Sequence, residues 1–162
     1  MADKNDQKKP EIRETLEADI DALIKLENLC FDTYYRDHRF THAEFEYYVR
    51  NGDTICLAAI ADSSPVGYVA GTIKRLRDRM LVSVDSIAVI ADFRKRGLGS
   101  RLLNALIRNA RRRGCERISL VVAARNEAGI GFFAERGFKR LRTIPSYYGE
   151  GIDGFLMVSD IS

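Results

Sequence analysis

The sequence predicts an α/β (α+β) fold with one mixed, partly parallel sheet of about seven strands and about four flanking helices. The first observation is the order of strand-like and helix-like segments, β-α-α-β-β-β-α-β-α-β-β. Its β-α-β-α-β portion requires crossover connections, which make neighbouring strands parallel. The second is size and composition: 162 residues, 46% hydrophobic and 30% charged, suit one globular domain with its own core. We expect a disordered tail at residues 1–11 and a single domain over residues 12–162.

The first elements are a strand and two helices. Residues 12–16 alternate in polarity and predict a strand, whereas residues 18–31 carry apolar side chains at helical spacing. Residues 41–49 predict a shorter helix. Thr41 is placed to be its N-cap, with Glu44 as the capping-box partner three residues later.

Three apolar strands are predicted next. Residues 54–61 and 66–73 are separated by Ser63-Ser64-Pro65, which predicts a turn and therefore a hairpin. Residues 80–90 form an apolar run too continuous for a solvent-facing edge, so this strand is predicted to lie centrally.

The second half continues with alternating helices and strands. The predicted elements are a helix from Leu98 ending near Gly114, a strand over 117–123, a helix over 126–136 ending at Gly137, and strands over 138–148 and 151–160. The first of these helices is amphipathic, with leucines on one face and arginines elsewhere.

Cysteines and histidines are too few and too scattered to form a disulfide framework or a metal cluster. They are Cys30, Cys56, Cys115, His38 and His42. We therefore expect a cytoplasmic protein with reduced thiols and no metal. No apolar run approaches the roughly 20 residues that span a bilayer, and the polar N-terminus is unlike a signal peptide. No membrane partner is expected, and the expected oligomeric state is a monomer or weak dimer.

The charge is unevenly distributed. Residues 1–80 carry 12 Lys/Arg and 15 Asp/Glu, a net charge of −3, whereas residues 81–162 carry 14 and 8, a net charge of +6. This favours an anionic partner for the second half, with a solvated basic face as the alternative. No nucleic-acid recognition module accompanies the arginines of the amphipathic helix, so no nucleic-acid partner is expected.

The stretch Arg94-Lys95-Arg96-Gly97-Leu98-Gly99-Ser100 has the chemistry of an anion site. A loop that enters a helix presents unpaired backbone N–H groups and the positive end of the helix dipole. Gly97 and Gly99 allow a ligand to approach the backbone, and the three cations add charge. The stretch is neither a P-loop nor a dinucleotide fingerprint, because the required lysine and third glycine are absent.

Residues 94–99 resemble the acyl-CoA-binding signature Arg/Gln-x-x-Gly-x-Gly/Ala of the GNAT superfamily of N-acyltransferases. Residues 126–138 are similar to that family's Asn-x-x-Ala-x-x-x-Tyr-x-x-x-Gly-Phe helix. The resemblance implies a GNAT-like fold and acetyl-CoA as cosubstrate. It implies that the cofactor is bound by Ile87, Ala88, Val89, Arg94, Lys95, Arg96, Gly97, Leu98, Gly99, Ser100, Asn126 and Phe133.

Residues 145–157 resemble the Tyr-Tyr…Asp-Ala…Met ending of protein N-terminal acetyltransferases, including those that act on ribosomal proteins. The resemblance implies that Phe31, Tyr147 and Tyr148 bind the acceptor, which would be a protein N-terminal α-amine. A tyrosine pair packed into a strand turn is the structural alternative. Two other functions stay open: acetylation of a small amine (amino acid, polyamine or aminoglycoside), and a non-catalytic acyl-CoA-binding domain.

Two positions depart from the family pattern. Phe133 stands where the family usually has a tyrosine that acts as general acid, and Val121 stands where the ribosomal-protein enzymes have a glutamate base. Tyr147 or Tyr148 is predicted to be catalytic in their place, as acid or as a base acting through water. Alternatives are catalysis by proximity and backbone dipoles alone, or binding without efficient turnover. Asp85 on the central strand is a further candidate base.

Overall fold

The computed structural model describes residues 9–31, 35 and 38–162, so most of the predicted N-terminal tail lies outside the described residues. One seven-stranded sheet has the order β1-β2-β3-β4-β5-β7-β6. The strands are β1 (Glu11–Glu14), β2 (Thr54–Ala61), β3 (Ser64–Leu76), β4 (Arg79–Val89), β5 (Cys115–Ala123), β6 (Lys139–Ile144) and β7 (Gly154–Asp160). The helices are α1 (Ile20–Cys30), α2 (His42–Arg50), α3 (Leu98–Arg112) and α4 (Glu127–Ala134), with short 3-10 turns η1 (Glu17–Asp19) and η3 (Ala91–Phe93).

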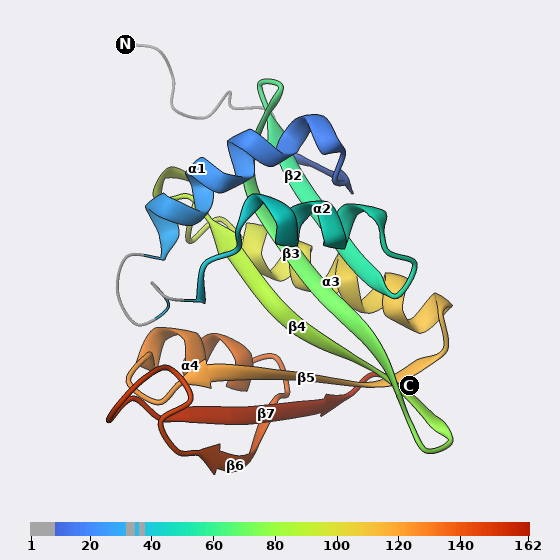
Figure 1. Cartoon of the computed structure of the whole chain (residues 1–162), viewed down its shortest axis with the longest axis vertical. Helices are drawn as coiled ribbons and strands as arrows, with labels where there is room; N and C mark the ends of the chain where they lie inside the picture. The colour runs from blue at the N-terminus through green and yellow to red at the C-terminus, as the bar shows by residue number, and fades with distance from the viewer. Residues whose placement is uncertain (1–8, 32–34, 36–37) are drawn as a thin grey trace.

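The sheet is mixed, as the sequence predicts. Strands β4 and β5 pair in parallel and are connected through α3, whereas every other neighbouring pair is antiparallel. β4 is the fourth strand of seven, which confirms its predicted central position. Helices α1 and α2 lie on one face of the sheet, and α3 lies on the other (Figure 1).

Strands β4 and β5 separate part-way along their length. Their pairing runs from Met80↔Cys115 to Val84↔Leu120 and stops, although both strands continue. The two ribbons diverge beyond that point (Figure 1). On its other side β4 stays paired with β3, with a register shift that leaves Asp85 as an extra, bulged residue between two paired ones. When this parallel pair of strands separates, the backbone groups on the facing edges of β4 and β5 no longer hydrogen-bond to each other.

The structure corrects several predicted boundaries. The β2–β3 turn is formed by Asp62 and Ser63, which have φ of 48° and 66°, so Ser64 and Pro65 already belong to β3. Two consecutive residues with positive φ match the twist of a tight hairpin, which explains why the turn is shorter than predicted. The last two strands are also shorter than predicted, because residues 145–153 form turns rather than strand.

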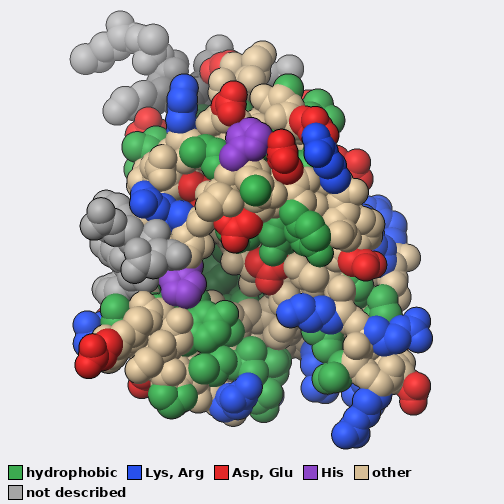
Figure 2. All heavy atoms as spheres, viewed as in Figure 1, with side chains coloured by type: hydrophobic (Ala, Val, Ile, Leu, Met, Phe, Trp, Pro, Cys, Tyr) green, Lys and Arg blue, Asp and Glu red, His purple; other side chains and the backbone are tan. Residues whose placement is uncertain are grey.

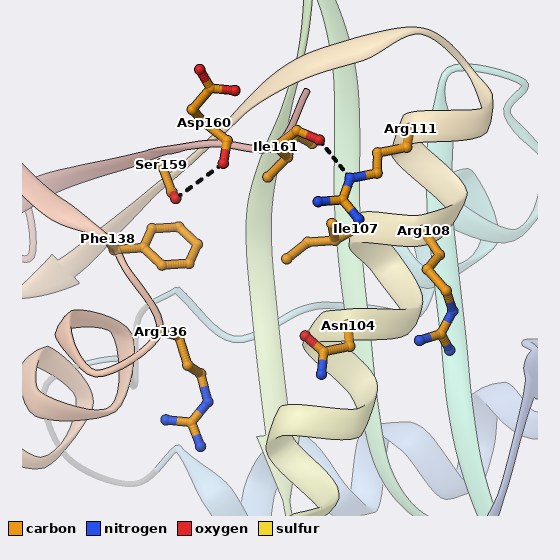
Figure 3. Close-up of a pocket in the computed structure, with 9 residues that line it drawn as sticks. All are labelled: Asn104, Ile107, Arg108, Arg111, Arg136, Phe138, Ser159, Asp160 and Ile161. Carbon is orange, nitrogen blue, oxygen red and sulfur yellow. Dashed lines mark hydrogen bonds between the residues drawn. The ribbon is translucent and has the colours of Figure 1, made fainter.

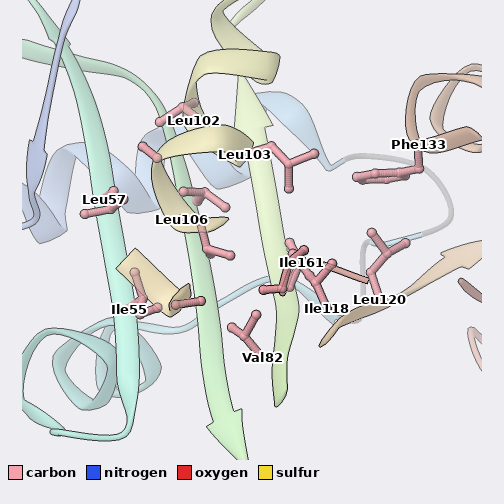
Figure 4. Packing of buried hydrophobic residues seen from close by; sticks show 14 of the residues in the cluster. Ile55, Leu57, Val82, Leu102, Leu103, Leu106, Ile118, Leu120, Phe133 and Ile161 are labelled. Atoms are coloured by element: carbon pink, nitrogen blue, oxygen red, sulfur yellow. The ribbon is translucent and has the colours of Figure 1, made fainter. Parts of the chain in front are cut away.

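Two hydrophobic cores lie on the two faces of the sheet. The larger packs α3 against β2–β5, with Ile55, Val82, Leu102, Leu106 and Ile118 among its fully buried members (Figure 4). The smaller packs α1 and α2 against β3 and β4. The predicted capping box at the start of α2 is confirmed: the Thr41 hydroxyl accepts the Glu44 N–H, and the Glu44 carboxylate accepts the Thr41 N–H.

A carboxyl group is buried in the smaller core. Glu27 of α1 is 1% exposed, accepts the Phe40 backbone N–H at 2.8 Å and is hydrogen-bonded to the Tyr68 hydroxyl. The Tyr68 hydroxyl also lies 2.6 Å from the Ser86 Oγ on β4. Burial raises the pKa of Glu27 above its ordinary value, although the hydrogen bonds from Tyr68 and Phe40 act in the opposite direction. This chain of contacts ties the segment before α2 to the strand at the split.

Replacing Glu27 by glutamine is expected to stabilise the fold more at pH 8 than at pH 5. The pKa of Glu27 is higher in the folded than in the unfolded protein, so the folded state favours the protonated carboxyl group. The free energy of unfolding of the wild-type protein therefore falls as pH rises from the ordinary glutamate pKa through the raised value. Each unit of raised pKa costs about 1.4 kcal/mol once the group is ionised, and glutamine avoids that cost while keeping an acceptor for Phe40 N–H. Denaturant unfolding at both pH values measures the difference.

Asp19→Asn is the control with the opposite sign. The Arg13 guanidinium holds the pKa of Asp19 below its ordinary value, so the ionised carboxylate stabilises the fold above the ordinary aspartate pKa and loses that effect as pH falls through the lowered value. A Glu27→Gln variant whose stability gain does not grow with pH would contradict the account of Glu27.

Candidate active site

The β4 side of the split presents backbone groups of the residues predicted to bind the acyl-CoA arm. Ile90 N–H donates to Val66 on the β3 side, so by alternation the backbone groups of Ala88 point toward β3, and those of Ile87 and Val89 point into the split. The Val89 carbonyl accepts the Arg94 Nε at 2.8 Å, which fixes this signature arginine against the strand. Ile87 and Val89 thus offer N–H groups toward whatever enters between the strands.

The β5 side of the split is capped by two tyrosine hydroxyls. Ala124 N–H donates to Asp153 on the β7 side, so by the same alternation the backbone groups of Val121 and Ala123 face β4. The Tyr148 hydroxyl donates to the Val121 carbonyl at 2.8 Å, and the Tyr35 hydroxyl accepts the Ala123 N–H at 3.1 Å. These tyrosines satisfy the polar edge that β4 leaves when it diverges.

An aromatic wall surrounds these hydroxyls, formed by Phe31, Tyr35, His38, Tyr147 and Tyr148. The rings form a connected set of contacts. The distances between ring centroids are 5.7 Å for Phe31–Tyr35, 4.9 Å for Tyr35–Tyr148, 5.0 Å for His38–Tyr148 and 4.8 Å for Tyr147–Tyr148. The structure therefore brings together all three predicted acceptor residues. The molecule is hollowed between the α1–α2 half and the β5–β7 half, with hydrophobic side chains in the depression (Figure 2).

Tyr148 is partly buried in this wall, and this burial raises its pKa well above the ordinary tyrosine value. A hydroxyl that holds its proton this firmly is a poor base, and its single proton already points to the Val121 carbonyl. Tyr147 is different, because 43% of its surface is exposed. The catalytic roles expected of the two tyrosines stay predictions, and the geometry describes Tyr148 best as an orienting group.

Gly154 allows the tyrosine turn to approach the sheet. A Cβ at this position would lie 2.6 Å from Val121 Cγ1 and 3.0 Å from Tyr147 Cβ, closer than real side chains pack. The turn is also held by Asp153, whose carboxylate accepts the Ser146 N–H at 2.9 Å. The family's ending has alanine where this chain has Gly154. Both Gly154 and Val121 thus differ from the family pattern, and the absence of a side chain at Gly154 makes room for the Val121 side chain.

The loop predicted to be an anion cradle leads directly into α3. Lys95 and Gly97 both have positive φ, 60° and 78°, which curls the loop into the helix. The first helical hydrogen bond runs from Arg101 N–H to the Gly97 carbonyl, so the N–H groups of Leu98, Gly99 and Ser100 precede the helical ladder. No heavy atom lies within 4 Å of a Cβ built on Gly97, so the space above the loop is open.

Two further predicted cofactor residues have structural duties. The Asn126 side chain caps α4 by accepting the Gly129 N–H at 3.0 Å and donates to the Tyr35 hydroxyl at 2.9 Å. Phe133 is only 7% exposed and packs against Phe138 in the larger core. The contacts of Asn126 and Phe133 with a CoA arm stay predictions. Asn126 is connected to the aromatic wall through its hydrogen bond to the Tyr35 hydroxyl.

A cavity of about 320 Å³ lies elsewhere, beside α3 on the other face of the sheet (Figure 3). Asn104, Arg108, Arg111 and Arg136 surround it. Arg136 Nε donates to the Ser100 hydroxyl at 2.8 Å, which links the cavity to the signature helix. None of the predicted acceptor residues lines it, so it is separate from the aromatic wall.

A model of the Acetyltransferase (GNAT) family matches residues 20–138. The chain belongs to the GNAT acetyltransferase family. The predicted resemblance is thereby confirmed, and so is the prediction of an N-acetyltransferase that uses acetyl-CoA. This GNAT chain is 28% identical to an N-alpha-acetyltransferase of Saccharolobus solfataricus over 166 residues, covering 97% of this chain and 96% of the relative.

Solved structures share the fold. Arabidopsis thaliana NAA60 in complex with acetyl-CoA matches with a TM-score of 0.80 and 22% identity, over 94% of this chain and 98% of that one. An aminoglycoside 6'-acetyltransferase type Ii matches with a TM-score of 0.78 and 22% identity, over 94% and 97% of the two chains. GNAT enzymes with different acceptors therefore share this architecture, which confirms the predicted fold class but does not select the acceptor.

Two features of the GNAT site were missed from the sequence. Tyr35 lies in a segment without periodicity, and only the fold brings it to Ala123 and Asn126. Asp85 was recognised as a carboxylate on a strand, but not its bulge or its partners. In the described part of the chain, no helix is long and apolar enough to cross a membrane, and no three potential metal ligands are grouped.

Proposed function

We propose that this enzyme acetylates the α-amine of protein N-termini in the cytoplasm, acting as a monomer or weak dimer. The observation that carries the proposal is the aromatic wall at the split of β4 and β5, which places Tyr147 and Tyr148 beside the strand edge predicted to hold the acetyl donor. The match to an archaeal N-alpha-acetyltransferase supports it, because it extends over 97% of this chain and so includes the tyrosine turn.

The donor end of the site fits an acyl-CoA. The N–H groups of Leu98, Gly99 and Ser100, with the α3 dipole, would hold the pyrophosphate, and Arg96 and Lys95 would add charge around it. Gly97 supplies the left-handed backbone that the curl requires, and the space above it is open. Acetyl-CoA supplies a thioester, whose carbonyl carbon is the atom that an acceptor amine attacks.

The strand edge would activate the carbonyl. The N–H groups of Ile87 and Val89 face the split, where one of them would donate to the carbonyl oxygen as negative charge develops on it. Backbone donors of a paired strand are fixed in direction, so they need no reorganisation during the reaction. The backbone groups of Ala88 point toward β3, so they would support the strand and not donate to the thioester carbonyl.

The aromatic wall would hold the acceptor on the other side. Phe31 and Tyr148 both contact Tyr35, and rings packed in this way would shield the acceptor amine from water. Tyr148 would orient the acceptor through its remaining lone pairs, because its proton is donated to Val121.

The test is CoA thiol release from acetyl-CoA with a panel of acceptors: short peptides with different free N-termini, N-terminally blocked versions of the same peptides, spermidine and an aminoglycoside. The proposal predicts turnover with free peptides and none with blocked ones. Turnover with spermidine or the aminoglycoside alone would move the enzyme to the small-amine class. No turnover with any amine, together with intact acetyl-CoA binding, would indicate a binding domain.

A further inference from the structure

A carboxylate lies at the closed end of the split, on the face that carries the aromatic wall. Asp85 follows Val84, the last β4 residue paired with β5, and Val121 follows its partner Leu120. Asp85 and Val121 are therefore the first residues of their strands beyond the last paired position. Val121 offers no carboxylate there, whereas the bulge on β4 carries one.

The side chain of Asp85 is held by three hydroxyls. Oδ2 accepts the Tyr48 hydroxyl at 2.6 Å and the Thr72 hydroxyl at 2.5 Å, and Oδ1 accepts the Ser83 hydroxyl at 2.7 Å. Three hydroxyl donors hold this solvent-exposed side chain in one rotamer.

The three side chains that donate to Asp85 carry no charge of their own. Tyr48 on α2 is neutral, because burial and its bond to Asp85 raise its pKa above the ordinary value, and Glu44 lies on the same helix close enough to contribute to that shift. Thr72 on β3 and Ser83 on β4 are uncharged donors. From β5, Tyr148 already donates its proton to Val121.

From this geometry we infer that Asp85 is the residue that receives the acceptor's ammonium group and takes up its proton through a water molecule. The inference rests on the proposed function and names the group that the family pattern lacks here. The ammonium loses one proton to Asp85, and the neutral nitrogen attacks the thioester carbon. A C–N bond forms, the C–S bond breaks, and the nitrogen's second proton goes to the departing sulfur, giving CoA thiol. Asp85 then returns its proton to bulk solvent, to which it is exposed.

The first test is Asp85→Asn, which keeps the shape of the side chain but removes its charge. With a peptide acceptor, kcat/KM at pH 7 should fall about 100-fold or more. The deficit should shrink to about tenfold or less at pH 9.5, because an α-amine of ordinary pKa about 7.7–8.0 is then already neutral. The dissociation constant for acetyl-CoA should be unchanged. Asp78→Asn, an exposed aspartate in the turn at the other end of the β3–β4 hairpin, should leave all three quantities unchanged.

A second pair of variants tests the positioning of Asp85. Tyr48→Phe removes one hydroxyl donor but keeps the ring that stacks on Phe40, so kcat/KM should fall about five- to twentyfold with the same pH dependence. Tyr47→Phe, on the adjacent exposed residue of α2, should have no effect.

The results can overturn the inference in three ways. An Asp85→Asn enzyme with wild-type kcat/KM, one whose deficit is the same at pH 7 and pH 9.5, or one that has lost acetyl-CoA affinity would each exclude this role. If the wild-type enzyme acetylates spermidine and not peptides, the proposed function is wrong. The role of Asp85 is then tested separately, with the same variants and spermidine as the acceptor.

Discussion

Gly97→Glu is expected to weaken acetyl-CoA binding at least about 100-fold, as measured by isothermal titration. Gly97 adopts a φ of 78° at the start of α3, and a side chain there would project into open space above the N–H groups of Leu98, Gly99 and Ser100. A carboxylate in that position would occupy the anion cradle and repel a pyrophosphate. A hundredfold loss corresponds to about 2.7 kcal/mol of binding free energy.

Gly114→Glu is the matched control for this substitution. Gly114 lies just beyond the other end of α3, has a φ of 85°, and likewise has no heavy atom within 4 Å of a Cβ position. Both variants should lose about 1–2 kcal/mol of stability from a non-glycine residue in the left-handed region. If both variants bind acetyl-CoA equally well, the anion cradle is misplaced.

Gly154→Ala is expected to lower kcat/KM for the acceptor about 10- to 100-fold while leaving acetyl-CoA affinity unchanged. The new Cβ would overlap Val121 Cγ1 and press on Tyr147 Cβ, so the turn that carries Tyr147 and Tyr148 must move. A displacement of the order of 1 Å at a positioning group costs about a hundredfold in rate. Steady-state kinetics with saturating acetyl-CoA and varied peptide measure the effect.

The double variant Gly154→Ala/Val121→Ala separates crowding from other causes. Removing the Val121 methyl groups relieves the 2.6 Å overlap but leaves the 3.0 Å approach to Tyr147, so activity should return in part. Additive losses in the double variant would contradict the view that Val121, Gly154 and the tyrosine turn form one packed unit.

Much of the fold was accessible from the sequence because local patterns agree with the tertiary structure. The apolar run at residues 80–90 became the central strand, and the leucine face of α3 packs on the sheet as its spacing predicts. Thr41 and Glu44 form the expected cap. The strand ends were less predictable, since Tyr147, Tyr148 and Ile152 are strand formers but the chain around them is bent at Gly149 and Gly151, both at positive φ.

The site was only partly predictable, for a physical reason. The residues of the proposed anion cradle are contiguous in sequence, so residues 94–100 were enough to predict a loop that leads into a helix. The aromatic wall is not local in sequence: Tyr35 and Tyr148 meet Ala123 and Val121 only because β4 and β5 separate after Val84↔Leu120. No pattern in a single strand signals where two strands will part, and the role of Asp85 depends on that point.

An enzyme that transfers acetyl groups at the split between β4 and β5 to a chain-terminal α-amine must distinguish that amine from a lysine side chain. The most direct measurement uses a peptide that has both a free N-terminus and an internal lysine, incubated with enzyme and acetyl-CoA, with the acetylated position read by tandem mass spectrometry. The account predicts acetylation at the α-amine, at a rate that Gly154→Ala lowers. Acetylation at the lysine side chain, or a rate that this substitution leaves unchanged, would contradict it.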